Sequence, residues 1–300
     1  MEFLAFDGPP RRYYCGDAAT SRRVWPLLVT RRLPAARPFC RWAARGGAAV
    51  HCGLRLRLHA GRGCCLAATR EIPAGRPLAS IPTRLAPTAC NAADTRETLA
   101  AVLARELHNP HSPHRPYLEF LHDIYNTDIY DRHSSLQEEL DTLYMGNAMS
   151  AKGVENAPFI TKNTLVTPSQ RVEWIRLHSM LRQIEQSLPH FASKSASWGM
   201  SMTLSRSIYD DNGGLNLYPI IDFSLHSFEP NSVIRITNPR NVQDKGIGLK
   251  WHDSKQPCVH LFSTRTISAG EPITILYSPR RVKTTEDAEY WKLRWGYVPN

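Results

Sequence analysis

The chain has 300 residues, enough for one large domain with a substantial core, and 42% of its residues are hydrophobic. Its formal net charge is +10, and no apolar run approaches the ~18 residues that a membrane helix needs, which excludes a membrane-spanning protein. The seven cysteines show no C-x-x-C spacing. Their pattern predicts free thiols in a reducing compartment and excludes a cysteine-rich zinc cluster, and no other metal site is predicted.

Most of the positive charge lies in the first 60 residues. This stretch holds eleven arginines, no lysine and three acids, a net charge of +8, and the other 240 residues carry the remaining +2. Residues 18–57 contain no acid. Such a composition is typical of a mitochondrial import segment, which would place the protein in the mitochondrion. It is also typical of an arm that lies on RNA phosphates, and an inert tail on a cytoplasmic or nuclear protein is a further interpretation.

After this extension the hydrophobic pattern predicts three strands. Residues 54–58 alternate between leucine and arginine with the period of two that a half-buried strand requires. Gly61-Arg62-Gly63 predicts a turn, and residues 64–69 and 77–81 predict the second and third strands.

The middle of the chain is predicted to be helical. Asp94 and Glu97 have the spacing of a capping box, and the apolar stripe that follows them ends at Asn109-Pro110. Residues 136–143 predict a second helix, and Thr167-Pro168 begins a third that runs to Pro189. From about Trp198 the pattern returns to short strands, predicted at residues 218–223, 233–237, 259–263 and 273–277.

Five blocks, in this order, resemble the SET domain of the Rubisco large-subunit lysine methyltransferase subfamily. The first is Gly61-Arg62-Gly63 with the turn I-P-A-G at residues 72–75 and Ile81-Pro82. The second covers residues 97–106 and 112–118, and the third joins Trp198 to residues 204–207. The fourth, residues 218–227 with Pro230-Asn231, is similar to the signature P-x-x-D-x-x-N-H-S. The fifth combines residues 270–277 with 293–297.

The resemblance implies a mainly β SET fold, made of small sheets with a threaded C-terminal crossing and interrupted by a helical insert. It divides the chain into a basic extension (1–50), the N-terminal part of the SET domain (51–92), the insert (93–197) and the C-terminal part (198–300). It also implies S-adenosylmethionine as cofactor and a lysine of a protein as substrate.

The resemblance assigns the cofactor to three places in the chain. Backbone groups of Gly61-Arg62-Gly63 would hold its methionine end, because glycine lets the chain approach closely. Arg206 would lie beside the cofactor or the substrate entrance, and Leu225-His226 would pass beside the adenine.

The resemblance also gives Tyr277 the position of the catalytic tyrosine, with Trp295 and Tyr297 as walls of the lysine channel. Three departures accompany it. Leu225 stands where the family has asparagine, so a polar side chain is missing from the cofactor crossing. Ser278-Pro279 follows Tyr277 in place of the usual glycine, and we expect the family's C-terminal substrate-binding domain to be absent.

Two functions therefore stay open. The first is a protein-lysine methyltransferase, weakened or inactive to the extent that Leu225 impairs cofactor binding. The second is a catalytically silent SET fold that serves as a structural subunit or assembly factor of an RNA–protein particle, such as the mitochondrial ribosome. In that role the arginine-rich residues 18–57 would contact ribosomal RNA and ribosomal proteins.

Overall fold

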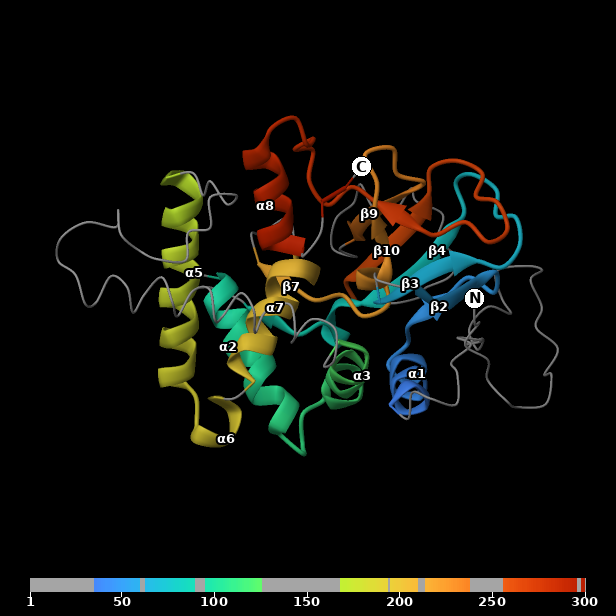
Figure 1. Cartoon of the computed structure of the whole chain (residues 1–300). Coiled ribbons are helices and arrows are strands. Elements are labelled where there is room, and N and C mark those ends of the chain that lie inside the picture. Colours follow the sequence, from blue (N-terminus) through green and yellow to red (C-terminus); the bar gives the residue numbers. More distant parts are fainter. Residues whose placement is uncertain are drawn as a thin grey trace.

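The computed structural model describes residues 35–59, 63–89, 95–125, 168–193, 195–209, 214–237, 256–295 and 298–299. Most strands gather on the right of Figure 1, and helices α2, α5, α6 and α7 form a layer on the left. The first half of the chain contributes α1 (Ala36–Arg45), β1 (Ala49–Val50), β2 (Leu54–His59), β3 (Gly63–Ala68), β4 (Pro77–Pro82), η2 (Thr83–Leu85), β5 (Thr88–Ala89), α2 (Thr95–His108) and α3 (Arg115–Tyr125). The second half contributes α5 (Pro168–Ser187), α6 (His190–Ser193), α7 (Ala196–Arg206), β6 (Ile208–Tyr209), β7 (Leu215–Asn216), η4 (Ile221–Phe223), β8 (Leu225–His226), β9 (Ser232–Thr237), β10 (Cys258–Ser263), β11 (Thr274–Ile275) and α8 (Thr285–Trp295). None of the helices in these ranges is long and apolar enough to cross a membrane.

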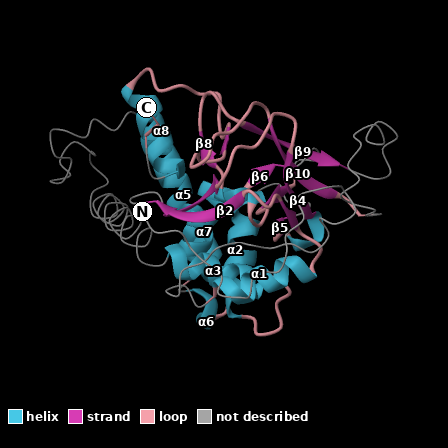
Figure 2. Ribbon diagram, turned by 90° about the vertical axis from the view of Figure 1, so that its right-hand side faces the viewer, coloured by secondary structure: helices cyan, strands magenta, loops and turns pink. Residues whose placement is uncertain are grey.

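The described strands form several small sheets (Figure 2). The largest is antiparallel with the order β1-β4-β10-β9, and β2 pairs with β3 in a separate antiparallel ribbon. A third sheet has the order β5-β7-β6, and β8 pairs with β11 in parallel. Two isolated bridges, Ala67↔Pro272 and Ile72↔Ile267, connect the β3 region to the segment that precedes β11. The C-terminal strands are therefore fastened to the first strands of the domain.

Burial follows the sequence pattern where one face of an element meets the core. In β2, Leu54 and Leu56 are buried and the arginines between and after them are half-exposed, as period-two alternation requires. The largest fully buried side chains come from α1, α3, α8 and the segment around η4, namely Phe39, Tyr117, Phe120, Tyr218, Phe223 and Trp291. The core thus joins helices at both ends of the chain to its middle.

Several predicted elements are confirmed, and two predictions are wrong. The predicted strands at 54–58, 64–69, 77–81, 233–237 and 259–263, the helix from Asp94 and the helix from Pro168 all appear within a few residues of their expected bounds. The predicted helix at 136–143 lies outside the described residues. Residues 218–223 are not a strand but a turn followed by η4, and Trp198 belongs to α7. At residues 218–223 the apolar run reflects nearly complete burial, which short helical segments and strands share.

The cysteine prediction is right for four thiols and wrong for one. Cys40, Cys64, Cys65 and Cys258 are free and buried. Cys52 is disulfide-bonded, which spacing along the chain does not reveal because cysteines meet through the fold. Burial raises the pKa of the Cys40 thiol to about 12, so this thiol is unreactive near neutral pH.

Helices α2 and α7 cross at Gly199 without room for a side chain. A Cβ atom at this position would lie 2.4 Å from the backbone oxygen of Ala100. We expect Gly199→Ala to lower the free energy of unfolding by about 1–3 kcal/mol, the usual cost of overpacking. In a helix with no neighbour at this position, replacing glycine by alanine raises the free energy of unfolding by about 1 kcal/mol. The sign of the measured change therefore shows whether the two helices are in close contact. Urea unfolding measures it, with Ser205→Ala on α7 as control, and a stabilised Gly199→Ala variant would contradict this close contact.

Candidate active site at the β8–β11 crossing

The centre of the site is a short parallel ladder between two strands far apart in the sequence. Leu225 pairs with Thr274, and His226 pairs with Ile275. The ladder continues by one hydrogen bond on each side, from the Leu225 N–H to the Ile273 carbonyl (2.9 Å) and from the Ser227 N–H to the Ile275 carbonyl (3.0 Å). A parallel pair this short has little stability of its own, so other contacts must hold it.

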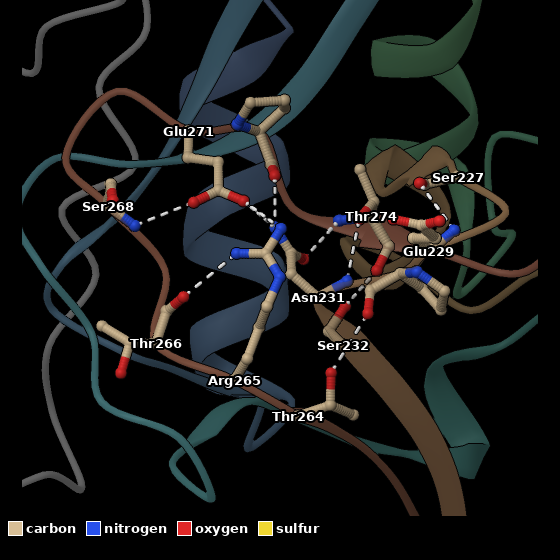
Figure 3. Close-up of polar contacts among 12 residues, drawn as sticks. Ser227, Glu229, Asn231, Ser232, Thr264, Arg265, Thr266, Ser268, Glu271 and Thr274 are labelled. Carbon is tan, nitrogen blue, oxygen red and sulfur yellow. Dashed lines mark hydrogen bonds and ion pairs between the residues drawn. The ribbon is translucent and has the colours of Figure 1, made fainter. Parts of the chain in front are cut away.

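Asn231 supplies those contacts (Figure 3). Its buried side-chain oxygen accepts a hydrogen bond from the Thr274 N–H (2.8 Å), and its own N–H donates to the Thr274 hydroxyl (3.0 Å). The Asn231 amide nitrogen donates to the Glu271 carboxylate (2.9 Å) and to the Pro272 carbonyl (2.8 Å). Through one amide group the loop after β8 is therefore joined to the segment that enters β11.

Glu271 fixes the orientation of that amide. Its carboxylate also accepts hydrogen bonds from Arg265 (2.7 Å) and from the Ser268 N–H (2.9 Å). Burial would raise the pKa of the Glu271 carboxyl, but the hydrogen bonds from Arg265 and Asn231 outweigh it and lower that pKa to about 2. The carboxylate is therefore ionised and acts only as an acceptor at neutral pH.

Tyr277 follows the ladder and is held at two points. Its hydroxyl donates a short hydrogen bond to the Ser224 carbonyl, and its N–H donates to His226 Nδ1 (3.2 Å). The ring is half-buried and lies 5.4 Å from the His226 ring, centroid to centroid. Both strands of the ladder thus position the tyrosine.

Helix α8 covers this tyrosine with aromatic rings. Trp295 lies 5.8 Å from the Tyr277 ring, and Trp291 lies 4.2 Å from Trp295 and 4.5 Å from His226. Phe228 completes the cluster at 4.6 Å from His226. The surroundings of Tyr277 are therefore largely apolar and aromatic on this side.

His226 is neutral at physiological pH. Burial lowers the pKa of its imidazole to about 4. Because Nδ1 accepts the N–H of Tyr277, the ring proton belongs on Nε2. That Nε2 atom is buried and has no hydrogen-bond partner in the described part of the chain.

A buried cluster of charged and phenolic groups lies next to the ladder. Arg206 contacts Asp222 twice, through the backbone carbonyl (2.9 Å) and the carboxylate (3.1 Å). The Tyr117 hydroxyl donates to the same carboxylate (3.0 Å). The Arg206 guanidinium also lies over two aromatic rings, 4.0 Å from the centroid of Tyr125 and 5.3 Å from that of Phe223. The guanidinium is thus held in one orientation.

Burial and the neighbouring charges act in opposite directions on the pKa values of this cluster. Burial raises the pKa of the Asp222 carboxyl to about 6, although Arg206 and Tyr117 pull it down. Burial alone would lower the pKa of Arg206, but the oxygens of Tyr125 and Asp222 outweigh it and raise that pKa. At neutral pH the two groups therefore form an ion pair.

The turn before Asp222 has an unusual backbone. Ile220 is fully buried and has a φ of 76° and a ψ of −52°, values near those of a strained γ-turn. Positive φ is a genuine outlier for a β-branched residue, and such strain gathers at functional sites. The turn sets the direction in which η4 presents Asp222 to Arg206.

Comparison with protein families matches residues 63–278 to the SET domain. The chain belongs to the SET-domain family. The match covers most of the described strands and both halves of the ladder. The mainly β SET fold with small sheets and a helical insert is therefore confirmed.

Solved structures support the same fold. The SET domain of LSMT bound to lysine and AdoHcy matches with a TM-score of 0.59 and 16% sequence identity, covering 89% of this chain and 57% of that one. Rubisco LSMT bound to sinefungin and monomethyllysine has a TM-score of 0.57, 15% identity and coverages of 89% and 56%. Rubisco LSMT bound to AdoMet has a TM-score of 0.57, 16% identity and coverages of 89% and 57%. The chain thus spans a little over half of these proteins, and no curated protein matches its sequence.

The residues present fit S-adenosylmethionine, the cofactor that the SET fold implies. Four buried atoms have no hydrogen-bond partner among the described residues and lie close together along the chain or in contact, namely Arg206 Nε, Asp222 Oδ1, Ser224 Oγ and His226 Nε2. Buried polar atoms are almost always hydrogen-bonded, so such a cluster calls for a ligand with its own donors and acceptors. The amino-acid and adenine groups of the cofactor provide both. Leu225 adds no polar group to this set.

The structure brings some of the sequence-predicted site residues together. Arg206, Leu225-His226, Tyr277 and Trp295 lie around the ladder as described above. Gly63 begins β3 opposite His59, and Gly61, Arg62 and Tyr297 lie outside the described residues. In the described part of the chain no cluster of histidine, cysteine and acidic side chains could hold a metal ion.

Sequence reasoning missed the residues that support these groups. Asp222 lies within the signature of the fourth block. An acidic residue inside a hydrophobic segment predicted to be buried is unusual, and this could have marked it as a site residue. Tyr117, Tyr125 and Trp291 come from helices whose partners the sequence does not identify. Their contribution appears only when α3 and α8 are packed on the sheets.

Proposed function

We propose that this chain is an S-adenosylmethionine-dependent protein-lysine methyltransferase. The observation that carries the proposal is Tyr277, whose hydroxyl is tied to the Ser224 carbonyl within an aromatic wall beside unpartnered buried polar atoms. The cofactor supplies a methyl group on a sulfonium centre. Transfer of that group is an in-line displacement, so the protein contributes mainly alignment and exclusion of water.

The chain's own residues have two tasks in this reaction. The lysine amine, with an ordinary pKa of ~10.4, must lose its proton, and apolar surroundings such as Trp295 and Trp291 favour the neutral form. The Tyr277 oxygen keeps lone pairs that accept a hydrogen bond from the amine and orient it. Arg206 and Asp222 hold the cofactor side of the site in place.

The first test is calorimetric titration of the full chain with S-adenosylmethionine. We expect saturable binding that Gly63→Trp weakens at least tenfold, because the indole would intrude where backbone must approach the cofactor. Ala44→Trp is the control, since this alanine is exposed on helix α1 and an indole there has room in solvent. A folded protein that binds no cofactor at millimolar concentration would remove the enzymatic function.

The second test replaces the tyrosine. Tyr277→Phe should lower methyl transfer from labelled cofactor to an array of lysine peptides by about 100-fold, the effect of losing one orienting group. Cofactor affinity should change less than about threefold, because the hydroxyl binds the Ser224 carbonyl and the lysine amine instead. Tyr209→Phe is the control, as this tyrosine is 48% exposed. Equal rates for wild type and Tyr277→Phe would rule out the proposed role.

A second candidate is a catalytically silent SET fold within an RNA–protein particle. Leu225 favours it, since the half-buried leucine presents no hydrogen-bonding group beside Ser224 Oγ and His226 Nε2, which have no partner in the part of the chain that the structure describes. The same titration separates the two functions, because a silent fold would remain folded and bind no cofactor.

A further inference from the structure

Helix α1 precedes the matched SET domain and belongs to the folded core. Its buried face consists of Ala36, Phe39, Cys40 and Ala43. Phe39 stacks on Phe120 with ring centroids 4.7 Å apart, and the Trp42 indole donates to the Pro113 carbonyl (2.6 Å). Removal of an import segment as far as residue 50 would empty this part of the core. The arginines of α1 therefore belong to the folded protein and not to a removable tail.

The opposite face of α1 carries three exposed arginines, Arg37, Arg41 and Arg45. Their spacing of four residues puts them on one side of the helix, with successive Cα atoms about 6 Å apart along its axis. Arg84 adds a fourth at the C-terminal end of the helix, since its guanidinium donates to the Gly46 carbonyl (2.9 Å) and to Gln256 (2.7 Å). We call these four residues the arginine face.

Arg84 and Arg45 lie at the C-terminal end of α1, where positive charge is favourable, but Arg37 and Arg41 add nothing to the stability of the helix. Like charges four residues apart repel, and Arg37 lies at the end of the helix where the backbone dipole is already positive. Helix α1 contains no acidic residue to offset this repulsion. Within the described part of the chain, Arg41 and Arg45 form no hydrogen bond or ion pair through their side chains. Their charges are available to a partner.

The chemistry of the face indicates the partner. The other exposed residues of α1 are Pro38 and Ala44, which are too small to insert into a lipid surface or to anchor a protein interface. Arginine forks match phosphate oxygens in pairs of hydrogen bonds. The face also continues an acid-free stretch that begins at residue 18, and such arginine-rich segments are typical of RNA binding.

We propose that the arginine face of α1 binds the phosphate backbone of RNA without reading its sequence. Arginine, proline and alanine are the exposed residues of the helix, so the amide and carboxylate side chains that read adenine and cytosine edges are absent there. Arginine can also contact guanine, but most hydrogen bonds from proteins to nucleic acids go to the phosphate and sugar, which is the contact proposed for this face. The inference concerns a surface outside the candidate active site and does not depend on methyl transfer.

The test is the salt dependence of RNA binding by the full chain. Fluorescence anisotropy with a labelled, unstructured 20-nucleotide RNA gives the dissociation constant between 50 and 300 mM salt. The triple variant Arg37→Gln/Arg41→Gln/Arg45→Gln should bind at least tenfold more weakly at low salt. Each lost phosphate contact lowers the slope of log K against log salt by about 0.7, so the slope should fall by about 2.

A matched control removes the same charge elsewhere. Arg105→Gln/Arg176→Gln/Arg182→Gln takes three exposed arginines from α2 and α5, and we expect its slope to stay within about 0.5 of the wild-type value. Thermal unfolding of the α1 variant should be unchanged or slightly higher, because the substitutions remove like-charge pairs. A loss of binding then cannot be attributed to unfolding.

Three outcomes would overturn the proposal. The first is wild-type protein that does not bind RNA at micromolar concentration. The second is an equal decrease in the salt-dependence slope for both triple variants, which would show that RNA binding depends on net charge and not on the arginine face. The third is arginine-dependent binding of duplex DNA, or of vesicles with anionic lipid, as tight as that of RNA, which would assign the face to a different partner.

Discussion

Replacing Asp222 by asparagine should lower the free energy of unfolding by about 3–5 kcal/mol, because Arg206 would be left as a buried charge without its counter-ion. The Asp222 side chain is fully buried and that of Arg206 is 11% exposed, so water cannot take over the lost interaction. The Tyr117 hydroxyl would lose its ionised acceptor as well. Urea unfolding at neutral pH measures the change.

Two further variants show whether charge is the cause. Glu119→Gln removes one acid from the Arg115–Glu119 pair, whose side chains are 40% and 39% exposed, and should change stability by less than about 1 kcal/mol. The double variant Arg206→Met/Asp222→Leu should be more stable than Asp222→Asn, because an apolar pair leaves no charge buried. If Arg206→Met/Asp222→Leu were as unstable as Asp222→Asn, an unpaired buried charge would not be the cause of the lost stability.

Replacing Asn231 by aspartate should be similarly damaging, and its effect should be centred on Tyr277. The new carboxylate would face the ionised Glu271 and the Pro272 carbonyl, where the wild-type amide donates two hydrogen bonds. We expect a loss of about 3 kcal/mol or more, the cost of unpaired buried acceptors and a like-charge contact. Hydrogen exchange should accelerate at the amides of Ser227 and Tyr277, which the ladder protects.

Exchanging the two groups provides the control. Adding Glu271→Gln to Asn231→Asp restores a donor opposite an acceptor, so the double variant should recover part of the lost stability and slow the exchange at Tyr277. No recovery would mean that the pair does not hold the ladder. In wild type, the lowered pKa of Glu271, about 2 against an ordinary 4.5, predicts a contribution that is complete above pH 4.5. That contribution is lost as the pH falls toward 2, and Glu271→Gln should show no such loss.

The sequence predicted the parts of the fold that depend on neighbours along the chain. The alternation of β2, the capping-box spacing in the sequence around the start of α2 and the proline at the start of α5 are local signals, and each lies within a few residues of its element. The five ordered blocks from Gly61 to Tyr297 predicted the family, and the family match covers residues 63–278 of that span. The same local signals failed at residues 218–223, because complete burial removes the polar face that distinguishes a strand from a turn or helix.

The sequence by itself therefore determined the fold family and the candidate tyrosine. Only the tertiary structure decided how that tyrosine is held. Asn231 and Glu271 join β8 to β11 across 40 residues of chain, and Tyr117 reaches Asp222 across 105. Such long-range contacts produce no periodic pattern in the sequence. The residues next to each partner along the chain do not determine which distant residue it contacts. The arginine face is similar, since its exposure depends on Phe39 and Trp42 fastening the other side of α1 to the core.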